Sequence, residues 1–124
     1  MEIRVAIDSD ARAIAEIHVH GWRSAYQGVV PQAHLDGLSV EMREVSWASA
    51  IEKGEPQIMV AESDSRVIGW VAFGRCRDSD KADHAGEIWA IYVSPEQLGR
   101  GVGCELWLRA FAELRRLGYL EVTL

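Results

Sequence analysis

The chain has 124 residues, of which 48% are hydrophobic and 26% are charged. These proportions are typical of one globular domain, so we expect residues 1–124 to form a single domain and exclude a disordered chain or a disulfide-stapled miniprotein. Because 19 acidic residues outnumber 13 Lys and Arg, the net charge of −6 argues against nucleic acid and anionic membranes as partners.

The first half of the chain predicts one strand followed by helices. Apolar residues alternate with polar or small ones over residues 2–7, which indicates a half-buried strand. Residues 8–10 can cap a helix in which apolar side chains recur every three or four positions up to about residue 25. A glycine and a proline then end this helix, and residues 32–53 are expected to form one or two further helical pieces.

The second half of the chain predicts four strands and one helix. The helix should cover residues 101–117, because its apolar side chains form one stripe and Gly118 can end it. The polar stretch 76–85 is expected to be an exposed loop. The four strands are predicted at residues 57–62, 66–75, 86–93 and 119–124. The first two of them should form an antiparallel hairpin, since only a short turn separates them.

The resulting order is β-α-α-β-β-β-α-β, which gives an α+β fold with a mixed sheet. A helix connects the last two strands, so these two should run parallel, while the earlier strands pair antiparallel. The last strand is apolar and ends at Leu124 without a closing turn or helix. Because such a strand needs a cover and a partner at its edge, we expect a C-terminally truncated form of a larger domain, or a second chain that supplies the missing elements.

A glycine-rich turn between the fourth strand and the last helix is the most informative segment. It reads Leu98-Gly99-Arg100-Gly101-Val102-Gly103. Its glycines let the backbone approach a ligand closely, and amides at a helix N-terminus lack intrahelical acceptors and favour anions. The sequence therefore predicts a phosphate or pyrophosphate site, with Arg100 at its rim. The turn is neither a P-loop, because no lysine follows, nor a Rossmann turn, because Cys104 stands where the third glycine belongs.

The segment from Glu87 to Gly103 resembles the central motif of the GNAT superfamily of acetyltransferases, a strand and a short turn followed by (Q/R)-x-x-G-x-(G/A). Arg100, Gly101 and Gly103 match this motif, whereas Leu98 occupies the position that is usually Gln or Arg. The resemblance covers essentially the whole chain and implies the acyl-CoA N-acyltransferase fold. The family normally continues with another helix, whose tyrosine is the proposed general acid, and no residue here can take that role.

The resemblance implies acetyl transfer from acetyl-CoA to a primary amine of a small molecule or peptide, by direct attack in a ternary complex. The glycine turn would bind the pyrophosphate, and the pantetheine arm would pair with the edge of strand 86–93. A backbone N–H there would polarise the thioester carbonyl. The residues implied to bind the coenzyme are Ile91, Tyr92, Val93, Leu98, Gly99, Arg100, Gly101, Val102, Gly103 and Cys104.

Glu87 is the candidate general base that removes a proton from the substrate ammonium group. It lies in an apolar strand four residues before Ile91, so the two side chains are expected to share a face. Burial would raise its pKa toward a useful value. The resemblance implies that a glutamate at this position acts directly or through water. A structural glutamate, paired with an arginine or exposed at the strand end, is the alternative.

Trp22 and Tyr26 are the candidate acceptor-binding residues, because the resemblance places the end of the first helix beside the acceptor pocket. Aromatic walls there could hold an amine by cation–π contact. Trp22 also falls on the apolar stripe of its helix, so a core role is the alternative. His18 lies on the same stripe and is expected to be a core histidine rather than a base.

The sequence predicts no metal site, because its four histidines and two cysteines show no ligand spacing. Cys76 and Cys104 are expected to be unpaired thiols of a cytoplasmic protein. We expect neither a secretory leader nor a membrane-spanning helix, because the sequence printed here has no run of about 18 apolar residues and residues 1–5 do not resemble a leader. Two other functions stay open. One is a non-catalytic acyl-CoA-binding or regulatory module, and the other is an assembly protein that forms a homodimer through the exposed fifth strand.

Overall fold

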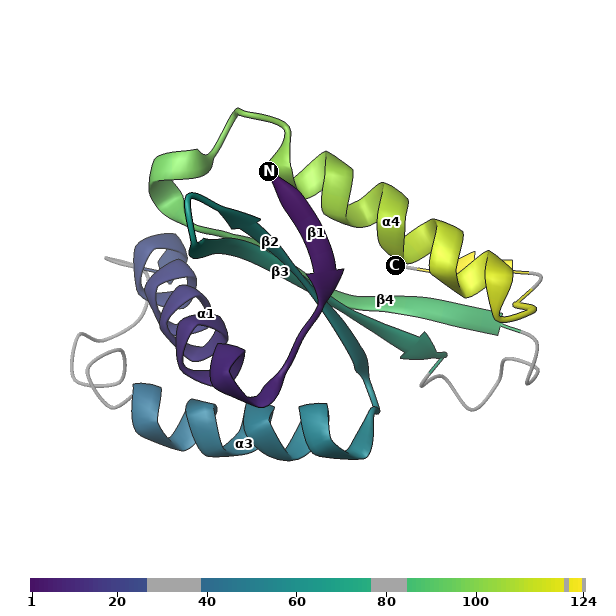
Figure 1. The fold of residues 1–124 in the computed structure, drawn as a ribbon, viewed down its shortest axis with the longest axis horizontal. Coiled ribbons are helices and arrows are strands. Elements are labelled where there is room, and N and C mark those ends of the chain that lie inside the picture. The colour runs from purple at the N-terminus through teal and green to yellow at the C-terminus, as the bar shows by residue number, and fades with distance from the viewer. Residues whose placement is uncertain (27–38, 77–84, 120, 124) are drawn as a thin grey trace.

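A computed structural model describes residues 1–26, 39–76, 85–119 and 121–123 of the chain, without the side chains of residues 22–26 and 123 (Figure 1). The strands are β1 (Glu2–Val5), β2 (Gln57–Ser63), β3 (Arg66–Arg75), β4 (Ala85–Val93) and β5 (Glu121–Thr123). The helices are α1 (Ala11–Tyr26), α3 (Val40–Lys53) and α4 (Val102–Arg116), with short 3₁₀ turns η1 (Asp8–Asp10) and η2 (Pro95–Gln97). The predicted α+β fold is confirmed.

The strands form one mixed sheet in the order β1-β2-β3-β4-β5. The first four strands pair antiparallel, and β5 runs parallel to β4, as the helical connection between them predicts. Two strands are shorter than the sequence indicates. β1 ends at Val5, and Tyr119 precedes β5, because its amide donates to the carbonyl of Leu114 and so closes the C-terminal end of α4. The homodimer that an exposed β5 would allow stays a prediction.

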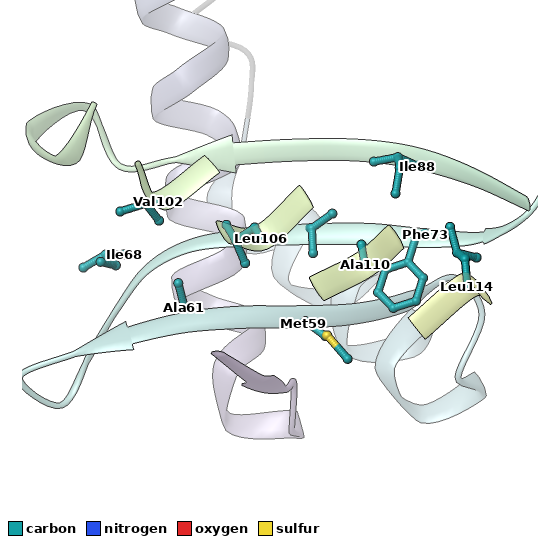
Figure 2. Packing of buried hydrophobic residues seen from close by; sticks show 10 residues of the cluster. Met59, Ala61, Ile68, Phe73, Ile88, Val102, Leu106, Ala110 and Leu114 are labelled. Carbon is teal, nitrogen blue, oxygen red and sulfur yellow. The ribbon is translucent and has the colours of Figure 1, made fainter. Parts of the chain in front are cut away.

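Helices cover both faces of the sheet. In Figure 1, α1 and α3 lie on one side and α4 lies on the other. Each side has its own apolar core, because residues along β2 and β3 point alternately to the two faces. Figure 2 shows the core under α4. Its buried residues are Met59, Ala61, Ile68, Val71, Phe73, Ile88, Val102, Leu106, Ala110 and Leu114.

The position of α4 on the sheet depends on a glycine in β3. A Cβ atom at Gly69 would lie 3.1 Å from Cδ1 of Leu106 and 3.2 Å from Cγ1 of Val102. Glycine therefore lets the first two turns of α4 pack directly on the strand. This close packing fixes the N-terminus of α4 beside the end of β4.

An ion pair ties β1 to the start of α1. The Arg4 guanidinium donates to both carboxylate oxygens of Asp10, at 2.8 and 3.0 Å, and the Ile7 amide donates to the same carboxylate at 2.8 Å. Burial pushes the pKa of Asp10 up, but these hydrogen bonds from Arg4 and Ile7 outweigh it and hold the pKa below its usual range. The pair therefore stabilises the fold where Asp10 is ionised.

Strand β4 carries one extra residue in its middle. Ala90 pairs with Ala72 of β3, but Ile88 pairs with the next residue, Phe73, so Trp89 has no opposite residue. Such a bulge interrupts the alternation of side chains along a strand.

None of the described helices is long and apolar enough to cross a membrane.

Candidate active site

The glycine turn has a backbone that only glycine adopts readily. Gly99 has φ +80° and Gly101 has φ +83°, both in the left-handed region. No protein atom lies within 4 Å of the place where a Cβ atom would stand at either residue. Packing therefore does not explain these glycines. The backbone conformation does, and it leaves the outer surface of the turn open.

The amides of this turn form a candidate anion site. Leu98 donates to the Pro95 carbonyl at 3.3 Å, and Glu105 donates to the Gly101 carbonyl at 3.0 Å. The amides of residues 99–104 lie between these two hydrogen bonds. Within the described part of the chain, none of them has a hydrogen-bond acceptor at normal geometry. They lie at the positive end of α4, where a diphosphate would be stabilised. Leu98, Arg100 and Cys104 of this turn have exposed side chains, and their role in binding the coenzyme stays a prediction.

Strand β4 is paired with β5 over a short stretch. Ala85, Gly86 and Glu87 face residues 121–123 of β5, and beyond them the described strands give β4 no neighbour on this side. The open stretch contains Ile91, Tyr92 and Val93, the predicted contacts of the pantetheine arm. An extended chain of amides can pair with such an edge as a peptide does.

Glu87 lies at the last position where β4 pairs with both of its neighbours, opposite Gly74 of β3 and Thr123 of β5. Ile88 and Ile91 both pack in the core under α4, because the bulge between them reverses the alternation. Glu87 precedes Ile88 and therefore faces the side of α1 and α3. The expectation that Glu87 and Ile91 share a face is wrong, since a period of two holds only for an uninterrupted strand.

Four aromatic rings from four elements meet on the side of the sheet that Glu87 faces. They belong to His18 of α1, Trp47 of α3, Trp70 of β3 and Tyr92 of β4. Tyr92 stacks on Trp70 with centroids 5.2 Å apart, and the His18 ring lies 5.0 Å from the Tyr92 ring. Trp70 is fully buried, and its Nε1–H has no hydrogen-bond partner among the described residues. Trp47 and Trp70 cannot be recognised as neighbours from the sequence, because nothing in their local patterns links them.

His18 is a neutral, structural histidine. Nε1 of Trp47 donates to Nδ1 of His18 at 3.3 Å, so this ring nitrogen accepts and carries no proton. Burial lowers the pKa of His18, and the positive charge of Arg43 lowers it further. This supports the expected core role and leaves Nδ1 unsuited to act as a base.

The predicted acceptor residues can be placed only by their backbone. Trp22 and Tyr26 belong to the last turns of α1, as expected, but their side chains lie outside the described residues. Their role stays a prediction.

Within the described ranges, no group of three or more His, Cys, Asp or Glu side chains could hold a metal ion. Neither cysteine forms a disulfide.

A separate cavity of about 750 Å³ lies between α1, the turn that joins β2 to β3, and η2. Its wall includes Ser94, Pro95 and Glu96 but no residue of the glycine turn. Two arginines, His20 and several carboxylates share its lining, so no single charge dominates. The anion site at residues 99–104 therefore rests on backbone geometry, not on this cavity.

Comparison with known proteins agrees with the fold. The sequence model of the Acetyltransferase (GNAT) family matches residues 10–124. YuaI of Bacillus subtilis, an uncharacterized N-acetyltransferase, is 31% identical over 94% of this chain and 66% of its own length. The L-amino acid N-acyltransferase MnaT of Escherichia coli is 30% identical over 95% of this chain and 65% of its own length. The chain thus spans slightly less than two thirds of these curated relatives.

Solved structures show the same arrangement of elements. The structure of yncA from Salmonella typhimurium with its cofactor acetyl-CoA superposes with a TM-score of 0.70 and 28% identity, covering 95% of this chain and 65% of that one. The PaiA N-acetyltransferase of Thermoplasma acidophilum in complex with coenzyme A has a TM-score of 0.78 at 19% identity, over 98% of this chain and 77% of that one. Since the family model covers nearly all of the sequence and the fold agrees with it, the chain belongs to the GNAT family of acetyltransferases.

Proposed function

We propose that the protein transfers an acetyl group from acetyl-CoA to a primary amine. One observation carries this proposal: the open amides of residues 99–104 stand at the N-terminus of α4, beside the part of β4 that extends past its pairing with Glu121–Thr123 of β5. The amides would bind the diphosphate, and the edge of β4 would bind the pantetheine arm. Bound acetyl-CoA in yncA and coenzyme A in PaiA support this use of the fold.

The proposed reaction is a direct displacement within a ternary complex. The amine nitrogen forms a bond to the thioester carbonyl carbon, and the carbon–sulfur bond breaks to release the CoA thiolate. A backbone N–H of the open stretch of β4 would stabilise the developing oxyanion. The substrate ammonium must first lose a proton, and the thiolate then takes one up. The products are an N-acetyl amide and coenzyme A.

Glu87 is the proposed proton acceptor, directly or through a water molecule. Its carboxylate faces the side of α1 and α3, where the last turn of α1 would present Trp22 and Tyr26 to the amine. The coenzyme lies along the edge of β4 in this proposal, so the base and the thioester would meet where β5 leaves β4. A carboxylate in that place can act on the amine without touching the diphosphate site.

The acceptor is proposed to be a small amine of the amino-acid class. This choice is supported by MnaT, named an L-amino acid N-acyltransferase, and by a Salmonella typhimurium relative named an L-methionine sulfoximine/L-methionine sulfone acetyltransferase, which is 30% identical. A peptide amine is the second choice. The partly exposed rings of His18, Trp47 and Tyr92 would offer an apolar surface to the carbon skeleton of either acceptor.

Two measurements test the proposal. Calorimetric titration with acetyl-CoA should show binding at one site, and release of free CoA should require an added amine from a panel of amino acids, amino-acid analogues and short peptides. Absence of acetyl-CoA binding would rule out the proposal. Binding without amine-dependent CoA release would instead support the non-catalytic acyl-CoA module.

A further inference from the structure

Helix α1 contains a glycine whose missing side chain is replaced by an aromatic ring. A Cβ atom at Gly21 would lie 2.9 Å from Cδ1 and 3.2 Å from Cε1 of Tyr92. Atoms of a side chain do not approach a ring carbon so closely, so no larger residue fits there without movement. Glycine weakens a helix interior, and its presence here is explained by the ring that packs against the α1 backbone.

The ring of Tyr92 has little room to move away. It stacks on Trp70 at an interplanar angle of 26°, and the His18 ring lies 5.0 Å from it. Trp70 is fully buried, and the Trp47 ring lies against it at 4.7 Å. Tyr92 is therefore held between the backbone of α1 and the buried ring of Trp70. Adding one carbon atom to such a close contact forces a shift of the side chain or of the backbone.

This contact joins the two sides of the proposed active site. Tyr92 lies in the stretch of β4 that has no β5 neighbour, where the thioester would bind. Gly21 stands immediately before the last turns of α1, which carry Trp22 and Tyr26 at the proposed acceptor side. We propose that Tyr92, packed against Gly21, is a positioning residue that sets the separation between the acceptor side of α1 and the thioester. This inference rests on the proposed acetyl transfer.

The expected effect follows from the geometry of attack. A nucleophile must approach to within about 3–3.5 Å of its target, and a misplacement of about 1 Å can cost a hundredfold in rate. The change Gly21→Ala demands a shift of a few tenths of an ångström in α1 or Tyr92. We therefore expect kcat/KM for the amine to fall about tenfold. The Kd of acetyl-CoA should stay within about twofold, because the glycine turn is untouched.

The experiment compares Gly21→Ala with Gly54→Ala and wild type. Gly54 ends α3 at φ +71° with nothing near its Cβ position, so alanine there strains the backbone without touching the contact between α1 and β4. Kinetics with varied amine, coenzyme calorimetry and the unfolding midpoint are measured for all three. The inference requires that only Gly21→Ala lowers kcat/KM for the amine per coenzyme-binding site. A general loss of folded protein would lower binding stoichiometry instead.

A second variant removes the ring instead of adding a methyl group. In the background of Tyr92→Leu, the change Gly21→Ala should lose most of its effect on amine kinetics, because the clash is gone. If Gly21→Ala fails to fold, Tyr92→Leu reports alone, and kcat/KM for the amine should fall by a larger factor than the Kd of acetyl-CoA rises, because leucine keeps the backbone groups with which the pantetheine arm would pair. An active wild type with unchanged amine kinetics in these variants overturns the inference and leaves acetyl transfer intact. A wild type that does not bind acetyl-CoA overturns both.

Discussion

The glycine turn and the aromatic wall are the two halves of the proposed site, and they are built in opposite ways. The turn is contiguous, exposed, and shaped by the backbone conformation of Gly99 and Gly101. The wall takes one ring from each of four elements, namely His18, Trp47, Trp70 and Tyr92, of which Trp70 is fully buried and the others are partly buried. A contiguous backbone motif can be identified in the sequence, whereas a surface assembled from distant elements exists only after folding. This explains why the coenzyme is easier to identify than the amine.

Replacing Glu87 should separate the two halves most strongly. Glu87→Gln keeps the size of the side chain but removes the base, so kcat at neutral pH should fall by about 10²–10⁴. The Kd of acetyl-CoA should not change, because the carboxylate lies apart from the glycine turn. Steady-state kinetics over a pH series with calorimetry would measure both. The shorter carboxylate in Glu87→Asp serves as the control and should keep part of the rate, and equal turnover of Glu87→Gln and wild type would exclude Glu87 from the mechanism.

The next largest effect is expected in the coenzyme half. Gly101→Ala places a side chain at φ +83°, which distorts the amides of the turn. Loss of one hydrogen bond to a charged group is worth about 1.5–3 kcal/mol, so the Kd of acetyl-CoA should rise about tenfold to a hundredfold. Gly118→Ala, at φ +98° with an open Cβ position, imposes similar strain beyond the other end of α4 and should leave the Kd unchanged. Equal loss in both variants would contradict a role of the turn in binding.

A substitution outside both halves should change stability and nothing else. Asp10→Asn removes the charge that pairs with Arg4, and we expect a loss of about 2 kcal/mol because a charged hydrogen bond is lost while Arg4 keeps its longer contact with Glu62. The pKa of Asp10 is depressed in the folded state, so its contribution is full above about pH 4 and is lost as pH falls further. Denaturant unfolding should therefore differ from wild type at pH 7 and converge toward pH 2. Divergence on acidification would contradict this assignment.

The smallest effect is expected from the rim of the turn. Arg100 is exposed, so its attraction to the diphosphate is screened by water and salt. Arg100→Gln should raise the Kd of acetyl-CoA several-fold at low salt, with a smaller difference at about 0.5 M salt. Titration at two ionic strengths measures this. If the loss is large and independent of salt, the guanidinium contributes more than a screened charge.

The sequence alone determined the element order, the parallel β4 and β5, and the glycine turn. These features depend on neighbours along the chain: the period of apolar residues, the helical connection, and the backbone freedom of glycine. The boundaries were less certain. The sequence predicts that β1 extends to Ile7, but the Ile7 amide donates to the Asp10 carboxylate just before α1.

Only the tertiary structure decided which side Glu87 faces and which rings form the wall. The extra residue Trp89 is visible only against the register of β3, because a bulge is a mismatch between two paired strands. Likewise, the sequence shows Gly21 only as a residue that weakens a helix. The fold explains it, because β4 packs the ring of Tyr92 against this position. Register and close approach are properties of paired and packed surfaces, so the periodicity of side chains along one strand or helix cannot predict them.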